Sequence, residues 1–391
     1  MKKILFVVNN MKIGGIQKSL INLLNEINTF YDISLIIFAP EGQLINYIPR
    51  NIKIISVNPL LQVLGINQKE SYGRGLKILS LQTFCAIWSR VFGNSWIINS
   101  LVKVGCIEET FDYAISYAQF FPAKYFVGGT NEYVLNCIKA NEKIAFIHSD
   151  FESYGGNNKY TRNKYKEFDK IAFCSNSIRK GFLKIMPELK NKTYVVKNFN
   201  NFSQIRAMAT KETVIYKKNA YNLISISRLT EEKGIDKAIK AVAYCIKKGI
   251  KINYHIIGDG PDKNILKNLI ENLAIENNVF FYEETVNPYR YIPNADLLLF
   301  PSVHEAAGLV IEEAASLGLP VLATKTISSD EMVLEKEFGW VAENSQEKFN
   351  EFLEFLLVNF KEVINKKEII KNKNFNNKLN LKQFKNLLKD C

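Results

Sequence analysis

Residues 300–324, FPSVHEAAGLVIEEAASLGLPVLAT, constrain the fold of this chain more than any other stretch. An apolar run at 297–300 stops at Pro301, and a second apolar run at 321–323 follows Pro320. The sequence between the two runs has the length of one helix. This order predicts two parallel strands joined by a crossover helix, so the chain is expected to be an α/β protein.

Gly308 stands at the expected start of the crossover helix, where backbone N–H groups have no partner within the helix and can face a ligand. Glu305 precedes the helix and Glu313 lies inside it. Both are expected on one side of the helix near its N-terminal mouth, whereas Glu312 is expected to point to solvent. The stretch therefore predicts a seat for an anion or for a ligand rich in hydroxyl groups.

Further short apolar runs predict the remaining strands, and they fall into two groups. The first group is 3–8, 33–38, 52–57, 113–116, 143–148 and 171–175, and the second is 222–227, 254–257 and 279–282. Residues 202–218 are charged and weakly patterned, and they are expected to connect two domains. We place these domains at 1–205 and 206–375, with a C-terminal helix at 376–391.

Two loops of the chain have residues suited to ligand contact. Gly14 and Gly15 follow the first strand and precede a helical pattern, so the backbone there can approach a ligand closely, although a plain turn is the alternative. Arg228 and Lys233 lie between the strand at 222–227 and a helix expected at 235–247. The two cations can converge on a phosphate, and two unrelated surface charges are the alternative.

His148 ends the strand expected at 143–148, and Asp150 follows it closely. This position is the carboxyl edge of the sheet, where open α/β sheets bind their ligands. A single His in such a place is often a structural residue with satisfied hydrogen bonds, so both interpretations remain open.

The charge balance predicts an anionic partner. The 391 residues include 51 basic and 39 acidic side chains, for a formal charge of +12. No nucleic-acid-binding motif is visible, which favours an anionic membrane surface over nucleic acid. Residues 60–104 combine Trp88 and Trp96 with an excess of basic residues, so this segment is expected either to lie on a membrane or to pack as ordinary helices.

No apolar stretch is long enough to span a bilayer, and the N-terminus has no cleavable signal pattern. We therefore expect a cytoplasmic protein, peripheral at the inner face of the cytoplasmic membrane if the basic segment contacts lipid. The six cysteines are scattered without a C-x-x-C pair, which favours reduced, buried thiols over disulfides or a zinc site. No D-x-D motif is present to hold a divalent metal on a diphosphate.

The pattern E-x-x-G-L-V-x-x-E-A from Glu305 to Ala314, followed by 318–321, GLPV, resembles the donor-site signature of glycosyltransferase family 4. This family comprises retaining glycosyltransferases with the GT-B fold. The resemblance implies two Rossmann-like domains facing each other across a cleft, with the helix at 376–391 returning to the first domain. It also implies transfer of a sugar from a nucleotide-sugar donor to a glycan or lipid-linked acceptor, with retention, in the synthesis of capsules or other surface polysaccharides.

The resemblance also assigns roles to residues. The R-x-x-x-x-K-G stretch at 228–234 is similar to the family's diphosphate clamp, and His148 is similar to its active-site histidine. Glu305 would contact the sugar and Glu313 the ribose. The implied catalytic residues are His148, Arg228, Lys233 and Glu305; the donor residues are Gly15, Arg228, Lys233, Val286, Asn287, Ala307, Gly308, Leu309, Val310 and Glu313; the acceptor residues are Gln17 and Asp150. No cofactor and no metal are expected.

The chain departs from the family pattern at Ala306 and Ala307, where the family has Gly and an aromatic residue, and at Gln17, where it has an acid. Three other functions stay open. They are a nucleotide-sugar epimerase of the same fold, a pyridoxal phosphate-dependent phosphorylase, which is usually far longer, and a binding subunit without catalysis. Hydrolysis of the donor would indicate a transferase, and an isomeric sugar would indicate an epimerase.

Overall fold

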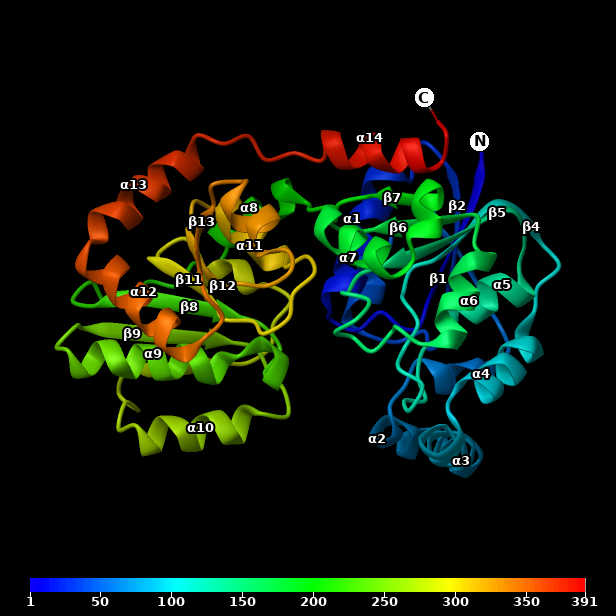
Figure 1. The fold of residues 1–391 in the computed structure, drawn as a ribbon, viewed down its shortest axis with the longest axis horizontal. Coiled ribbons are helices and arrows are strands. Elements are labelled where there is room, and N and C mark those ends of the chain that lie inside the picture. The colour runs from blue at the N-terminus through cyan, green and yellow to red at the C-terminus, as the bar shows by residue number, and fades with distance from the viewer. Residues whose placement is uncertain (391) are drawn as a thin grey trace. The chain divides into compact units, whose positions relative to one another are not determined.

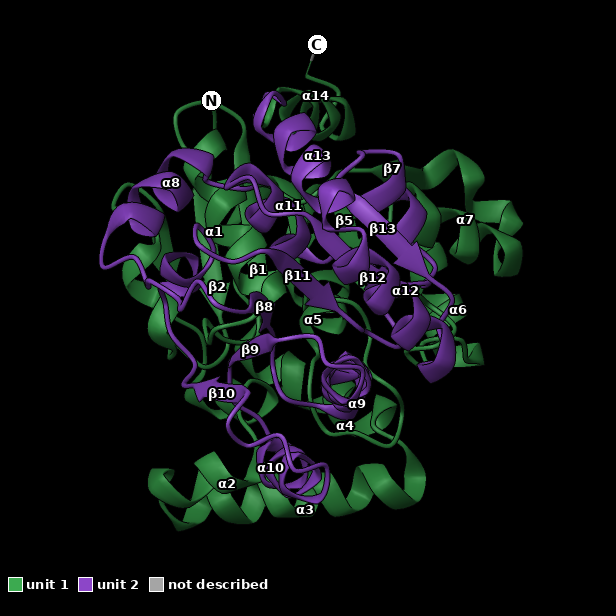
Figure 2. Ribbon diagram, turned by 90° about the vertical axis from the view of Figure 1, so that its left-hand side faces the viewer, with its two compact units in different colours: residues 1–199, 377–391 green, residues 200–376 purple. Residues whose placement is uncertain are grey.

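The computed structural model describes residues 1–390, which form two compact units (Figure 2). Unit 1 contains residues 1–199 and the C-terminal segment that begins at Asn377, and unit 2 contains residues 200–376. Both are α/β structures built on parallel strands (Figure 1). The α/β class predicted from the sequence is confirmed.

Unit 1 is organised around a parallel sheet, in which the described residues form seven strands in the order β3-β2-β1-β4-β5-β6-β7. The strands are β1 (Lys3–Val8), β2 (Asp32–Ile37), β3 (Lys53–Ile55), β4 (Thr110–Ser116), β5 (Lys139–Ile147), β6 (Lys170–Phe173) and β7 (Thr193–Val195). The helices are α1 (Gly15–Ile27), α2 (Gln68–Ser71), α3 (Leu76–Phe92), α4 (Ser95–Val102), α5 (Thr130–Cys137), α6 (Lys159–Glu167), α7 (Asn176–Ile185) and α14 (Lys378–Leu387).

The core of unit 1 follows from the apolar runs of its strands. Five of the six residues of β1 are buried, as expected for a strand covered on both faces. On one face Phe6 packs with the apolar side of α1 and with Phe384 of α14, whose ring centroid lies 6.5 Å away. Lys170 of β6 donates from Nζ to the carbonyl oxygen of Leu387 over 2.6 Å. These contacts explain why α14 belongs to unit 1 although unit 2 precedes it in the chain.

The described residues of unit 2 form a six-stranded parallel sheet in the order β10-β9-β8-β11-β12-β13. Its strands are β8 (Tyr221–Ile226), β9 (Ile252–Ile257), β10 (Val279–Tyr282), β11 (Leu297–Phe300), β12 (Val321–Thr324) and β13 (Gly339–Ala342). Its helices are α8 (Phe202–Thr210), α9 (Ile235–Lys247), α10 (Lys263–Asn272), α11 (Leu309–Ser316), α12 (Gln346–Val358) and α13 (Phe360–Lys371).

Alternate residues of the unit 2 strands enter two separate cores, because successive side chains of a strand point to opposite faces. Leu297 and Leu299 of β11 pack with α9, α10 and α12. Leu298 and Phe300 pack with α8 and α11 on the other face. The pair of parallel strands predicted within 297–324, β11 and β12, is present and is joined by α11.

One expectation about the connection between the two groups of strands is wrong. Residues 202–218 were expected to be a connector, but α8 occupies 202–210, and Phe202, Ile205 and Ala209 are buried in a core of unit 2. These three apolar residues recur at helical spacing, and Asn201 caps the helix by accepting a hydrogen bond from the backbone N–H of Gln204.

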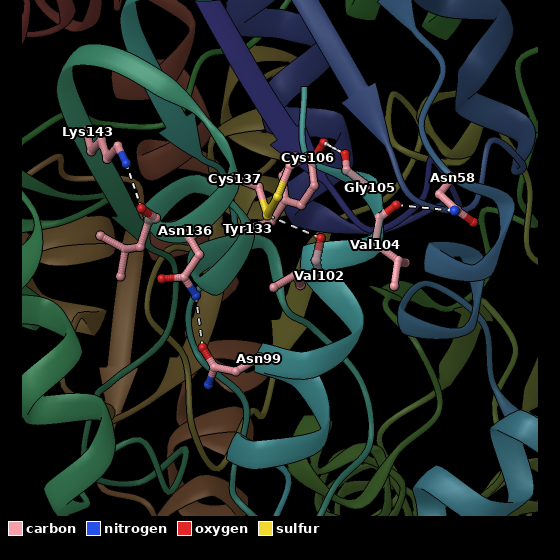
Figure 3. Close-up of a disulfide and its surroundings, with 11 residues drawn as sticks. Asn58, Asn99, Val102, Val104, Gly105, Cys106, Tyr133, Asn136, Cys137 and Lys143 are labelled. Atoms are coloured by element: carbon pink, nitrogen blue, oxygen red, sulfur yellow. Dashed lines mark hydrogen bonds between the residues drawn. A yellow bond between two sulfur atoms is a disulfide. The ribbon is translucent and has the colours of Figure 1, made fainter. Parts of the chain in front are cut away.

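The expectation of reduced cysteines is also corrected, because Cys106 and Cys137 form a disulfide (Figure 3). Hydrogen bonds also join the segment after α4 to α5 near the disulfide. For example, Tyr133 Oη donates to the carbonyl oxygen of Gly105 over 2.6 Å. Cys85, Cys174 and Cys245 are buried, and Cys391 lies outside the described residues. The pairing joins residues 31 positions apart, a proximity that no local pattern indicates.

No helix within residues 1–390 combines the length and the apolar character needed to cross a bilayer.

Candidate functional site

The strand order of unit 2 reverses between β8 and β11, and the loops that follow these two neighbouring strands lie together. Val303 of the second loop donates its backbone N–H to the carbonyl oxygen of Glu232 in the first, over 2.9 Å. Gly234 has φ +61°, and a Cβ there would lie 2.3 Å from the carbonyl oxygen of Pro301, so only glycine fits. A crevice at such a reversal is where open α/β sheets bind ligands.

Lys233 and Glu305 meet between these two loops. The Nζ of Lys233 lies 2.8 Å from Oε2 of Glu305, and the two side chains are 20% and 14% exposed. Ser328 supports the loop by donating its hydroxyl to the carbonyl oxygen of Glu305 over 2.7 Å. The sequence predicted that both residues bind the donor, and the structure brings them into direct contact.

Arg228 lies on the same loop as Lys233 but has a different partner. Its Nη2 is 3.5 Å from Oε1 of Glu232, and the side chain is 61% exposed. The pKa of Glu284 is raised, mainly by burial and also by the negative charge of Asp259. The positive charge of Arg228 opposes this increase in the pKa of Glu284. Arg228 and Lys233 therefore pair with two different carboxylates, Glu232 and Glu305, in this structure.

Two hydroxyl groups beside Arg228 are buried. Ser227 Oγ and Thr230 Oγ1 have no hydrogen-bond partner among the described residues. Buried hydroxyls are almost always hydrogen-bonded in folded proteins, to protein, water or a ligand. The loop therefore offers polar groups that a ligand can satisfy.

The N-terminus of α11 begins at Gly308, which caps the helix without a side-chain hydrogen bond. A Cβ on Gly308 would lie 2.7 Å from the ring of Phe300, so the start of the helix packs tightly against the end of β11. Ala307, Leu309 and Val310 are half-buried around it. The first N–H groups of a helix favour an anion, and those of α11 begin at Leu309, four residues after Glu305.

Glu313 is 2% exposed on α11 and accepts a hydrogen bond from the hydroxyl of Tyr289 over 3.3 Å. Tyr289 belongs to the 3₁₀ turn Pro288–Tyr291, which follows the predicted base-contacting residues. Of these, Val286 is 44% exposed, and Asn287 donates from Nδ2 to the carbonyl oxygen of Met208 over 3.0 Å. The exposed side chain of Val286 is thus three residues before Tyr289, which binds Glu313.

Glu312 does not point to solvent as expected. Its Oε1 lies 2.9 Å from Nζ of Lys336, and its Oε2 accepts from Nδ2 of Asn200 over 2.9 Å. The side chain is 26% exposed. The pattern of α11 alone could not reveal these partners, because both come from distant parts of unit 2.

In unit 1 the strand order reverses between β1 and β4, and the Gly14-Gly15 loop follows β1. Gly15 is exposed, and space is open where its Cβ would be. Gln17 donates from Nε2 to Oδ1 of Asn10 over 3.4 Å. The predicted glycine loop is present at the N-terminus of α1, and Gln17 folds back towards it.

His148 directly follows β5, and its ring lies 4.7 Å from the ring centroid of Tyr117 and 5.8 Å from that of Phe146. Burial lowers the pKa of His148 to about 3, so the imidazole is neutral at pH 7. Nε2 is buried without a hydrogen-bond partner among the described residues. The backbone N–H of His148 donates to Oε1 of Gln119 over 3.1 Å, which fixes the end of the strand.

Asp150 and His148 form no hydrogen bond or ion pair with each other in the described part of the chain. Its Oδ2 accepts from the backbone N–H of Ser153 over 2.9 Å, so the carboxylate stabilises its own loop.

The residues that support the site, Tyr289, Ser328 and Gln119, were not found from the sequence. They act by contacts across the fold, and no motif in the sequence identifies them.

Residues 209–386 match the family described as glycosyl transferases group 1. Over 140 residues the chain is 32% identical to an uncharacterized glycosyltransferase of Methanocaldococcus jannaschii, which covers 35% of this chain and 34% of that protein. Over 124 residues it is 35% identical to a lipopolysaccharide glucosyltransferase of Escherichia coli, which covers 31% and 33%. The chain thus spans about a third of the length of these curated relatives.

A solved structure of Anabaena HepE with UDP-glucose superposes with a TM-score of 0.69 at 17% identity, over 100% of both chains. This likeness extends over both units and confirms the two predicted α/β domains. The chain therefore has the GT-B fold, and residues 209–386 match the family of glycosyl transferases group 1.

Proposed function

We propose that this protein is a glycosyltransferase that moves a sugar from a nucleotide-sugar donor to a glycan or lipid-linked acceptor. The observation that carries the proposal is the contact between Lys233 and Glu305 at the strand reversal of unit 2, beside the N-terminus of α11. The family match to residues 209–386 covers both residues and supports the same assignment.

Departure of a nucleoside diphosphate leaves negative charge on its phosphate oxygens, and the protein must stabilise that charge. Lys233 and the first N–H groups of α11 are the groups near the strand reversal that can do so. Arg228, on the same loop and 61% exposed, is available to turn towards the same phosphates. Because Lys233 is paired with Glu305, a bound diphosphate would share the ammonium group with that carboxylate.

The two carboxylates have different surroundings, which suits two different hydroxyl ligands. Glu305 lies on the loop before α11, where it would accept hydrogen bonds from the transferring sugar. Glu313 is buried inside the helix and held by Tyr289, where it would accept from the ribose. A carboxylate that accepts from two neighbouring hydroxyls makes a strong and directional contact.

In unit 1, His148 is the strongest candidate for contact with the sugar or the acceptor. Its imidazole is neutral, so it can exchange a hydrogen bond with a hydroxyl but cannot pair as a cation at pH 7. The loop with Gly15 and Gln17 would contribute to the acceptor site. Asp150 would contribute only if its hydrogen bond to Ser153 opens.

We further propose retention of configuration, a role in surface polysaccharide synthesis, and work at the inner face of the cytoplasmic membrane. The similarity to a lipopolysaccharide glucosyltransferase supports the surface-glycan role. UDP-sugars are the first donors to test, since the structural relative HepE was solved with UDP-glucose. Metal independence is proposed because the chain has no D-x-D motif.

A donor screen tests the proposal and separates it from the alternatives. The protein is incubated with a panel of nucleotide sugars, thermal shift reports binding, and mass spectrometry reports products. A transferase is expected to release nucleoside diphosphate slowly by hydrolysis and faster with an acceptor. An isomeric nucleotide sugar would indicate an epimerase, and binding without any product would indicate a binding subunit.

A further inference from the structure

Helix α3 presents its apolar residues to the outside of unit 1. Its buried positions are Ile78, Gln82, Cys85 and Ser89, which recur at steps of four, three and four residues along one face. Its exposed large apolar residues are Leu76 (83% exposed), Phe84 (53%), Ile87 (58%), Val91 (66%) and Phe92 (70%). A helix that packs on a protein in water normally shows the reverse arrangement.

The inward face of α3 includes two polar residues, Gln82 and Ser89, beside Ile78 and Cys85. Gln82 is 3% exposed and donates from Nε2 to the carbonyl oxygen of Ile66 over 3.3 Å, and Ser89 is 1% exposed. The helix packs on α2 and α4 rather than on the sheet, and it lies at the end of unit 1 away from the strands (Figure 1). The apolar face of α3 is therefore uncovered within unit 1.

An aromatic group extends this face onto α4. The ring centroid of Trp88 lies 6.0 Å from that of Phe84, 4.8 Å from that of Phe92 and 5.0 Å from that of Trp96. Trp96 is 60% exposed. Tryptophan is favoured at the interface between lipid and water, where its ring is partly apolar and its N–H stays near polar groups.

The charge around α3 selects the partner. Residues 71–107 contain no Asp or Glu and four basic residues. Lys77 and Arg90 are exposed on α3, and neither makes an ion pair with a described residue. Arg74 is different, because it pairs with Glu41 and contacts Gln62. A positive rim around an apolar face complements an anionic lipid surface, and it would repel a second copy of the same face.

A shallow, open depression of about 640 Å³ lies along the same helix. Its lining includes Leu76, Leu79, Phe84 and Ile87, and Lys77 is its cation. Apolar side chains beside one cation suit the upper part of an acyl chain below an anionic headgroup.

We propose that α3 is a membrane-docking helix that lies in the plane of an anionic lipid surface. Its face of Leu76, Phe84, Ile87, Val91 and Phe92 enters the acyl boundary, with Trp96 at the headgroup level and Lys77 and Arg90 on the phosphates. Gln82 and Ser89 face the protein. The proposal stands on unit 1 alone and does not depend on the donor site of unit 2.

The test measures sedimentation of the full chain with vesicles of phosphatidylcholine, with and without phosphatidylglycerol. The variant Ile87→Ser/Val91→Ser removes two exposed apolar residues of α3. Its matched control, Phe355→Ser/Val358→Ser, removes two from α12, where these side chains are 51% and 68% exposed. We expect the wild type and the control to bind anionic vesicles and the α3 variant to bind at least about tenfold more weakly.

The charge arm uses Lys77→Gln/Arg90→Gln, for which we expect weaker binding to anionic vesicles and a smaller effect of salt. Tryptophan emission gives an independent readout. In a Trp340→Phe background the remaining tryptophans are Trp88 and Trp96, and their emission should shift to the blue on binding. Equal binding by the wild type and the α3 variant overturns the proposal, and so does a wild type that ignores anionic vesicles.

Oligomeric state and donor hydrolysis complete the test. A wild-type dimer that the α3 variant converts to a monomer would assign the face to a second copy and overturn the lipid proposal. The α3 variant should hydrolyse the donor at the wild-type rate, because its substitutions lie outside unit 2. Loss of vesicle binding with intact hydrolysis therefore supports docking whatever the donor proves to be.

Discussion

The ammonium group of Lys233 lies 2.8 Å from a carboxylate oxygen of Glu305, although 72 positions separate the two residues. They meet because β8 and β11 are neighbours in the sheet and each residue lies on the loop after its strand. Gly234 permits the close approach of the loops at Pro301. A cation and an acid are thus held beside the N-terminus of α11 before any ligand binds.

Replacing Glu305 by Gln tests its proposed contact with the sugar. The amide keeps the size of the side chain but loses the charge, so we expect turnover to fall by about 100-fold with a small change in KM for the donor. Steady-state kinetics with the donor found in the screen measures both. A KM effect with unchanged kcat would assign Glu305 to ground-state binding instead.

Replacing Tyr289 by Phe tests whether it positions Glu313. The change removes only the hydroxyl that donates to Oε1 of Glu313, and the affinity for the nucleotide should fall by about fivefold, as for one lost hydrogen bond of about 1 kcal/mol. Tyr291→Phe, in the same 3₁₀ turn, is the comparison, because the hydroxyl of Tyr291 accepts a hydrogen bond from Nη2 of Arg290 over 3.2 Å. If the two changes lowered the nucleotide affinity equally, Tyr289 would have no specific role in positioning Glu313.

Glu132 provides a test of stability against pH. Burial raises its pKa to about 7, and Tyr160 donates to its Oε1 over 3.2 Å. Between the ordinary pKa near 4.5 and pH 7 the folded state binds the extra proton, so this group's contribution to stability falls as pH rises through that range. Glu132→Gln keeps the shape without the titration, and thermal unfolding should show it more stable than the wild type at pH 8 but equal at pH 4. A difference that is the same at both pH values would contradict the assignment.

The contribution of His148 to stability changes with pH in the direction opposite to that of Glu132. Its pKa is lowered to about 3 in the folded state, so from pH 6.5 down to pH 3 the unfolded state binds the extra proton and stability is lost as pH falls. His148→Gln should reduce this acid sensitivity by about 1 kcal/mol per pH unit over that range. Chemical unfolding at several pH values, compared between variant and wild type, isolates the residue from Glu132 and His255. Parallel pH curves would rule out a buried neutral imidazole.

The disulfide makes a prediction about thiols. The chain has six cysteines, so a Cys106–Cys137 bond leaves four titratable thiols in the denatured, unreduced protein. Closing a loop of this length is expected to stabilise the fold by about 3 kcal/mol, and a reductant should lower the melting temperature. Cys106→Ser/Cys137→Ser should melt at the lower temperature with and without reductant. Six titratable thiols in the denatured, unreduced protein would show that the bond does not form.

The sequence predicted the elements whose signal is local. The helix at 235–247 and the strands at 3–8 and 279–282 have the predicted bounds, because an apolar run or a glycine marks each end. The pairing of Lys233 with Glu305 was not predicted, although both residues were assigned to the donor site. A motif shows which residues belong to a site, whereas the sheet order determines which of them touch.

The errors also have physical causes. The charged residues of 202–218, most of which follow position 210, obscured the helical spacing of Phe202, Ile205 and Ala209. Glu312 was expected to face solvent because the helical pattern does not reveal its ion pair with Lys336, which lies 24 positions away in the sequence. The disulfide forms because the segment after α4 packs against α5, and the spacing of the cysteines in the sequence does not indicate this packing.

The central claim is that a nucleoside diphosphate binds at Lys233 and the N-terminus of α11 in unit 2. Isothermal titration of UDP, or of the nucleotide that the donor screen selects, tests it most directly when the wild type is compared with Lys233→Ala. Lys348→Ala is the control, because Lys348 pairs with Glu351 on the surface of α12, away from α11 in the sequence. We predict that Lys233→Ala weakens binding by at least about tenfold, the loss of one charge-assisted contact, while Lys348→Ala binds as the wild type does. Unchanged affinity in Lys233→Ala would contradict the account.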